Sequence, residues 1–312
     1  MKSAAAATGA PAPGALPWLA ALLALAVVFV WGTNFVVIKF ALAQLPPLLL
    51  AALRFALAAV PLVFFLPRPR TVSWRNLALY GVAIGVGQFG LLFYAMTRHI
   101  SPGLASLVIQ AQVFFTVALA MALAGERVRP HQVVAAALAL GGMALIASRS
   151  GGDSQTSALG VLLALGAAFS WGVGNMASRA AGRVNVLAYV AWSSLFAVPP
   201  LLVASFCYEG WPRMLDGLKA ANGATWAAVL WQSVGNTMFG YGAWAWLLGR
   251  YSASAVSPFA LLVPVFGMGA AALTLGEAMP AWKLLAAALV LCGLALNLLW
   301  PLWRRWLALA SR

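Results

Sequence analysis

Charged side chains are scarce in this sequence. Only 8% of its 312 residues are Asp, Glu, Lys or Arg, whereas 64% are hydrophobic. A soluble domain has about a quarter of its residues charged and about half apolar. Because so little charge cannot cover a water-soluble globule, the composition excludes an ordinary soluble protein.

Acidic residues are the scarcest charged type: five Asp and Glu stand against 19 Lys and Arg, which gives a formal net charge of +14. A nucleic-acid site needs Lys and Arg gathered on one soluble face. Here they lie in short connections between apolar runs, so we expect no nucleic-acid partner. Proton-coupled carriers usually place a titratable group in the membrane. Only Glu126 and Glu277 are candidates for that role, and both fall in connections.

Residues that carry chemistry in enzymes are also few. The sequence has two Cys and two His, and it shows no metal-ligand cluster, no Walker loop and no nucleophile with a paired base. Cys207 and Cys292 lie in or beside apolar runs, where unpaired side chains are expected. We therefore predict no metal, no cofactor and no enzymatic activity. An intramembrane enzyme or a structural membrane subunit is the alternative from a different class.

Long apolar runs with few charges are what the sequence has in abundance. A helix needs about 20 apolar residues to cross a hydrocarbon core, and runs of that length without alternation predict helices rather than barrel strands. The predicted fold class is all-α integral membrane, with ten transmembrane helices. The runs cover residues 18–38, 45–66, 77–96, 102–123, 133–147, 158–176, 186–206, 226–248, 253–275 and 284–303.

The distribution of basic residues predicts the orientation. If the first helix starts inside, about two-thirds of the Lys and Arg fall on the cytoplasmic side, which is the side that positive charge favours. We expect a multi-pass protein of the bacterial inner (plasma) membrane with both termini cytoplasmic. Residues 1–17, rich in Ala, Pro and Gly, are expected to form a disordered tail.

The sequence contains an internal repeat. FVWGTNFVVIKFAL at residues 29–42 aligns with FSWGVGNMASRAAG at 169–182, and ALALGGMAL at 137–145 aligns with ALVLCGLAL at 288–296. Each copy has five predicted helices, so the second copy enters the membrane from the opposite side. We predict two inverted five-helix repeats, at residues 18–150 and 151–312. Inverted repeats are typical of transporters whose substrate site lies near the midplane.

A resemblance to a known family is carried by five stretches. They are WGTNFVVIK at 31–39, PPLLLAALRF at 46–55, GLASLVIQAQVFFT at 103–116, GER at 125–127 and SPFALLVPVFG at 257–267. The chain thereby resembles the EamA-type exporters of the drug/metabolite transporter superfamily. The resemblance implies ten helices in inverted repeats and export of amino acids and related metabolites. It extends to exporters of aromatic amino acids and of O-acetylserine and cysteine, and no motif separates these substrates.

Polar and aromatic side chains within the apolar runs are the candidates for substrate binding. Polar groups are costly in a bilayer and usually face the bundle interior, where they either line a path or hold a neighbouring helix. Both alternatives stay open here. The candidate substrate-binding residues are Asn34, Gln88, Tyr94, Gln110, Trp171, Asn175, Gln232, Asn236, Tyr241 and Trp244.

Helical spacing predicts which of these side chains share a face. Gln110 and Phe114 lie four residues apart, so Gln112 is expected to point elsewhere. Gln232 and Asn236 are also four apart and are expected on one face. Arg54 is the only basic residue well inside a run. It is expected either to pair with carbonyl or glutamine oxygens or to meet a substrate carboxylate.

The leading functional hypothesis is a carrier that exports neutral amino acids, aromatic ones included, by alternating access and without a coupling ion. The alternatives are an O-acetylserine/cysteine exporter and a proton-coupled drug/metabolite antiporter. The expected partners are small-molecule amino acids and the lipid bilayer. The oligomeric state stays open, with a monomer among the alternatives.

The orientation is testable with reporter fusions. Fusions after Arg70, after Arg183 and at the C-terminus should report a cytoplasmic location, because positive charge is retained on that side. Fusions after Arg98 and Asp216 should report an external location. An external C-terminus would contradict the inverted-repeat prediction as well.

Overall fold

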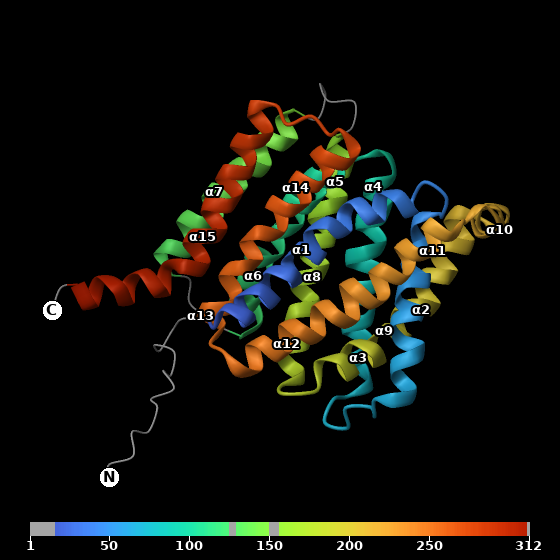
Figure 1. Ribbon diagram of the computed structural model, residues 1–312, viewed down its shortest axis with the longest axis horizontal. Helices are drawn as coiled ribbons and strands as arrows, with labels where there is room; N and C mark the ends of the chain where they lie inside the picture. The colour runs from blue at the N-terminus through green and yellow to red at the C-terminus, as the bar shows by residue number, and fades with distance from the viewer. Residues whose placement is uncertain (1–15, 125–128, 150–155, 311–312) are drawn as a thin grey trace, which may run out of the picture.

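The computed structural model describes residues 16–124, 129–149 and 156–310, and every regular element in these ranges is a helix. The helices pack side by side in a bundle (Figure 1). The first half contains α1 (Trp18–Ala41), α2 (Pro47–Phe65), α3 (Trp74–Gly81), η1 (Val82–Gly90), α4 (Leu91–Arg98), α5 (Pro102–Val108), η2 (Ile109–Ala111), α6 (Gln112–Ala124) and α7 (Pro130–Ser148). The second half contains α8 (Ala158–Ala181), α9 (Val186–Ala204), η3 (Ser205–Glu209), α10 (Trp211–Ala220), α11 (Gly223–Leu230), η4 (Trp231–Phe239), α12 (Gly240–Arg250), α13 (Ala253–Val256), η5 (Ser257–Leu261), α14 (Leu262–Leu275) and α15 (Ala281–Ala310).

The predicted all-helical membrane fold is confirmed. Within the described ranges, nine helical runs are long and apolar enough to span a membrane. The one remaining predicted span, the eighth, is the unbroken run of α11, η4 and α12, whose middle is more polar. It carries the buried side chains of Gln232, Ser233, Asn236 and Thr237.

Departures from α-helical geometry recur at equivalent places in the two halves. The third and eighth spans each contain a π-helical segment, η1 and η4, and the fourth and ninth each contain a 3₁₀ segment, η2 and η5. Segments of both kinds often mark functional positions, because they turn side chains away from the regular helical face. Each half of the fold therefore contains one π-helical and one 3₁₀ segment at corresponding positions.

One helix differs from the sequence prediction, which placed a connection between the seventh and eighth spans. The short helix α10 lies there instead, with Met214 and Gly217 buried and charged residues exposed. Met214 and Gly217 are three residues apart and so share one face. A Cβ on Gly217 would lie 2.7 Å from Pro46 Cδ, which shows how closely α10 packs at the start of α2.

Small residues allow α1 to pack tightly against α14. A Cβ added to Gly32 would lie 2.6 Å from both Phe266 Cβ and the Val263 carbonyl oxygen. Such close backbone approach is the usual basis of helix association in membranes. Gly32 therefore allows α1 and α14 to approach this closely.

The helices α7 and α15 form a pair at one edge of the bundle (Figure 1). They too meet through glycines, because a Cβ on Gly142 would lie 2.8 Å from the Ala286 carbonyl oxygen and one on Gly293 would lie 2.5 Å from that of Ala135.

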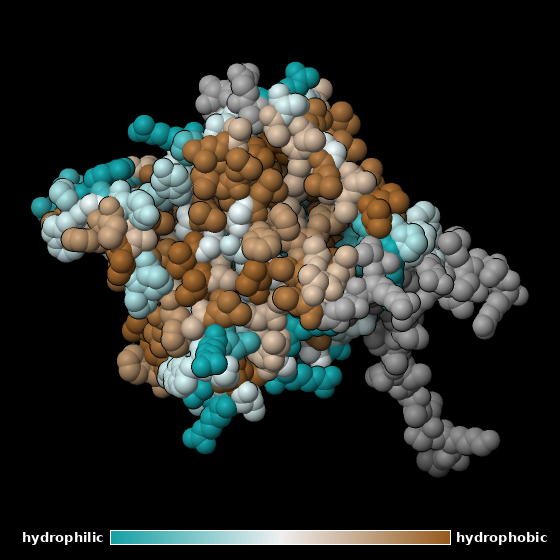
Figure 2. Space-filling view, turned by 180° about the vertical axis from the view of Figure 1, so that it is seen from behind, coloured by the Kyte–Doolittle hydropathy of each residue, from teal (hydrophilic) through white to brown (hydrophobic). Residues whose placement is uncertain are grey.

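Apolar side chains cover the outside of the bundle. Leu273 is 88% exposed and Phe65 is 81% exposed. Figure 2 shows hydrophobic residues over the broad middle of one face and most hydrophilic residues towards its margins. A soluble monomer rarely exposes so large an apolar surface, so this surface faces lipid.

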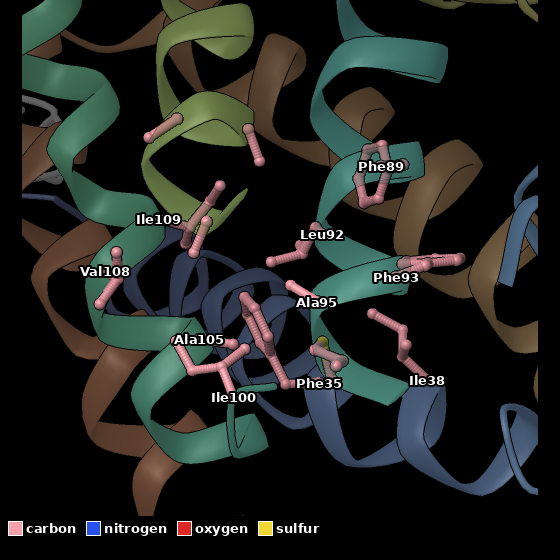
Figure 3. Packing of buried hydrophobic residues seen from close by; sticks show 14 of the residues in the cluster. Phe35, Ile38, Phe89, Leu92, Phe93, Ala95, Ile100, Ala105, Val108 and Ile109 are labelled. Atoms are coloured by element: carbon pink, nitrogen blue, oxygen red, sulfur yellow. The ribbon is translucent and has the colours of Figure 1, made fainter. Parts of the chain in front are cut away.

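A cluster of apolar side chains fills the space between α1, α4 and α5 (Figure 3). We call five of them the plug. They are Ile38, Leu92, Ala95, Ile100 and Ala105, each at most 2% exposed. The plug lies near the C-terminal end of α1, where Lys39 Nζ also donates to the carbonyl oxygens of Met96 and Thr97 at 2.9 and 3.1 Å.

The packing at Gly32 is testable by substitution. Gly32→Ala forces a methyl group into the Val263 carbonyl and should lower stability by about 1–3 kcal/mol, the usual cost of overpacking. Gly141→Ala is the matched control, because nothing lies within 4 Å of a Cβ there. Thermal unfolding of the purified proteins, monitored by size-exclusion chromatography, measures the difference in stability between the two variants. Equal stability of the two variants would contradict the packing shown here.

Candidate functional site

A cavity of about 360 Å³ lies inside the bundle, between the two halves of the fold. This size is within the range of small-molecule sites, about 300–1,000 Å³. Its floor on the plug side is formed by Phe35, Ile38, Leu92 and Ile109. All four of the irregular segments η1, η2, η4 and η5 contribute residues to its wall.

Most of the predicted site residues come together at this cavity. They lie on five different spans, from the first to the eighth, so the fold and not the sequence spacing gathers them. The lining residues among them are Asn34, Gln88, Gln110, Trp171, Asn175, Asn236, Tyr241 and Trp244.

Two predicted residues lie elsewhere. Tyr94 is 46% exposed and stacks on His99 with ring centroids 5.9 Å apart, at the end of α4. Gln232 is fully buried, and its Nε2 donates to the Ala228 carbonyl oxygen at 3.4 Å. It is absent from the cavity lining, whereas Asn236 is part of it. The common face that the spacing predicts for these two residues stays a prediction.

The prediction that Gln112 points away from the cavity is also wrong. Both Gln110 and Gln112 line it. The reason is the 3₁₀ segment η2, which covers Ile109–Ala111 and changes the helical phase between the two side chains. Sequence spacing carried no signal for this local tightening.

Two buried amide side chains leave an oxygen free at the cavity. Asn34 and Gln88 are each 3% exposed, and neither Asn34 Oδ1 nor Gln88 Oε1 has a hydrogen-bond partner among the described residues. A buried acceptor without a donor costs about 1–3 kcal/mol. These two oxygens are therefore ready to accept hydrogen bonds from a bound molecule.

The second repeat has an asparagine one position beyond the equivalent of Asn34, and its side chain is engaged differently. Asn175 Nδ2 donates to Gln112 Oε1 at 2.8 Å and to Thr116 Oγ1 at 3.0 Å. These bonds tie α8 to α6, which is the structural alternative that the sequence left open. Asn34 thus has a free amide oxygen, whereas Asn175, at a neighbouring position of the repeat, connects two helices.

Three aromatic side chains in mutual contact form an aromatic wall of the cavity. The ring of Trp31 lies 5.8 Å from that of Tyr241 and 5.2 Å from that of Trp244, and its Nε1 donates to the Asn236 carbonyl oxygen at 3.2 Å. A Cβ on Gly240 would lie 2.3 Å from Trp31 Nε1, so glycine leaves room for the indole. Trp31 is absent from the predicted site, although its alignment with Trp171 in the repeat was a usable signal.

Arg54 lies beside the cavity rather than in its lining. It is 1% exposed, Nη2 donates to Thr237 Oγ1 at 3.0 Å, and Cζ is 3.8 Å from the Phe89 ring centroid. A desolvated cation–π contact contributes about 2 kcal/mol, which offsets part of the cost of burying the charge. Its polar partner is a hydroxyl, not the carbonyl or glutamine oxygen considered from the sequence.

Glu277 is held outside the cavity, on the far side of the plug. Its carboxylate accepts hydrogen bonds from Ser101 Oγ at 2.5 Å and from the Gly103 backbone N–H at 2.9 Å. Lys283 Nζ lies 3.3 Å away as an ion-pair partner. The carboxylate therefore caps the start of α5, where backbone N–H groups lack helical partners. Its repeat counterpart, Glu126, lies outside the described residues.

Comparison with known proteins agrees with this architecture. The EamA-like transporter family matches residues 18–148 and 158–299. A probable amino-acid metabolite efflux pump of Escherichia coli K12 is 41% identical over 288 residues, covering 91% of this chain and 96% of that protein. A protein of the same description from Salmonella typhimurium LT2 is 42% identical and covers 88% and 93%.

A more distant relative and a solved structure extend the comparison. A probable terminal-alkyne amino-acid exporter of Streptantibioticus cattleyicolor is 30% identical and covers 81% of this chain and 82% of that protein. A crystal structure with a TM-score of 0.60 and 22% identity covers 91% of this chain and 98% of the other, which shows a shared fold. The chain belongs to the EamA-like transporter family, within the drug/metabolite transporter superfamily.

Proposed function

We propose that this protein exports neutral amino acids, aromatic ones included, from the cytoplasm by alternating access. The observation that carries the proposal is the cavity itself, whose lining combines unpartnered amide oxygens with a cluster of aromatic side chains. A free amino acid has an ammonium group that donates hydrogen bonds to such oxygens. The names of the relatives, which are amino-acid efflux pumps and exporters, support the same substrate class.

The aromatic wall favours apolar and aromatic side chains. Trp31, Tyr241 and Trp244 lie in mutual contact, and rings at these separations offer stacking surfaces that contribute about 0.5–1.5 kcal/mol beyond burial. A substrate whose ammonium group meets Asn34 and Gln88 would place its side chain against this wall.

The plug gives the proposed transport a direction. It seals the cavity towards Ala41, the end of α1 that the charge distribution predicts to be external. Of the lining residues of α1, Trp31 and Asn34 precede the plug residue Ile38 and so lie farther from Ala41. In this conformation the cavity is closed to the outside, and substrate enters from the cytoplasm.

We further propose that movement is downhill, without a coupled ion. Coupling needs a proton site that senses the substrate through differential affinity. None of the three described acids, Glu209, Asp216 and Glu277, lines the cavity. Glu209 accepts from the backbone N–H groups of Leu48 and Leu49, and Glu277 caps α5.

The cavity assignment predicts the effect of removing its amides. Asn34→Ala and Gln88→Ala should each weaken phenylalanine counterflow in proteoliposomes by about five- to 150-fold in half-saturating concentration, because a lost hydrogen bond to a charged group costs about 1–3 kcal/mol. Tyr94→Ala is the control, since Tyr94 lies outside the cavity. Unchanged counterflow in both amide variants would show that the substrate binds elsewhere.

The driving force is tested with the same proteoliposomes. Labelled phenylalanine should equilibrate across the membrane without any imposed gradient, and a pH gradient should not concentrate it. The physical reason is that the Glu277 carboxylate is already held by Ser101, Gly103 and Lys283. Uphill accumulation that is driven by a pH gradient and abolished by Glu277→Gln or Glu126→Gln would refute downhill transport.

A further inference from the structure

The guanidinium of Arg54 is a positive charge held next to the cavity wall. Its Cζ lies 3.8 Å from the ring centroid of Phe89, and Phe89 itself lines the cavity. Its Nη2 donates to Thr237, the residue that follows the cavity residue Asn236. One aromatic ring and one residue of η4 therefore connect this charge with the proposed substrate site.

The guanidinium has donors without partners. Arg54 Nε and Nη1 are buried and have no hydrogen-bond partner among the described residues. The helices and helical segments packed against α2 carry two acidic residues within the described ranges, Glu209 on η3 and the exposed Asp216 on α10. The Glu209 carboxylate binds the backbone N–H groups of Leu48 and Leu49 and the hydroxyl of Ser205. Because arginine stays protonated in proteins, the charge has no counter-ion in this part of the structure.

We propose that Arg54 is a specificity-determining residue that selects molecules carrying a carboxylate. The inference rests on the proposed transport of amino acids. It assigns a protein partner to each of the two charged groups of the zwitterion. The ammonium group meets the free oxygens of Asn34 and Gln88, and the carboxylate is oriented towards Arg54. Attraction acts across the Phe89 ring because charges interact more strongly in a low-dielectric interior than in water. An amine without a carboxylate is repelled by the same charge.

A purely structural arginine in this protein offers a matched control. Arg68 also stacks on an aromatic ring, with Cζ 3.7 Å from the Trp74 centroid, and its Nη2 donates to the Val72 carbonyl oxygen at 2.9 Å. Neither Arg68 nor Trp74 lines the cavity. Removal of Arg68 therefore eliminates a comparable contact without changing the field at the substrate site.

The test compares L-phenylalanine with L-phenylalaninamide, which lacks the carboxylate. Both ligands compete with labelled phenylalanine in counterflow, and their thermal stabilisation of the purified full chain gives a readout that does not depend on transport. The wild type should prefer the acid by about ten-fold or more, because opposite unit charges several Å apart attract by more than about 1.4 kcal/mol at an effective dielectric constant of about 20. Arg54→Met should abolish this preference, Arg54→Lys should retain it, and Arg68→Met should leave it unchanged.

The outcomes separate this inference from the proposed function. A wild type that accepts acid and amide equally, or an Arg54→Met variant that keeps the preference, overturns the role of Arg54. If Arg54→Met does not fold, Phe89→Leu decides, because removing the ring gives the carboxylate closer access and must increase the preference for the acid. An unchanged or lower preference contradicts the inference. A wild type that neither binds nor transports phenylalanine contradicts the proposed function itself.

Discussion

Every polar group in a hydrocarbon environment needs a hydrogen-bond partner, and the rest of this structure depends on that requirement. It makes the spans helical, and it explains where the few acids lie. Glu209 and Glu277 each bind backbone N–H groups at the start of a helix, α2 and α5 respectively, where the helix itself supplies no acceptor. Two of the five acidic side chains thus accept hydrogen bonds from backbone N–H groups of a helix that is distant in the sequence.

Because of the same requirement, polar atoms that lack a hydrogen-bond partner indicate where a ligand could supply one. The free oxygens of Asn34 and Gln88 face one cavity, and the spare nitrogens of Arg54 lie beside it. The irregular segments η1, η2, η4 and η5 surround the same place in both repeats. Polar side chains and broken helical geometry therefore coincide near the middle of the bundle, where a membrane protein tolerates them only around a cavity.

The sequence predicts the architecture well because apolar run length is a direct consequence of bilayer thickness. The site was predicted less completely, for local reasons. Gln112 was misplaced because η2 changes the helical phase, and no residue pattern in the sequence indicates such a change. Gln232 is fully buried outside the cavity lining. Tyr94 has the right chemistry and depth, but it lies on the outer face of α4. Which face of a helix is inward depends on packing between distant spans.

The plug has a thermal consequence. In alternating access, opening the end of the cavity near Ala41 brings the side chains of Ile38, Leu92 and Ile100 into contact with water. Newly wetted apolar surface adds about 0.45 cal/K/mol to the heat capacity for every Å², so the balance between sealed and open forms is a curved function of temperature. Hydrophobic contacts weaken on cooling. A cold membrane therefore loosens this seal while it slows the helix movements that would open it.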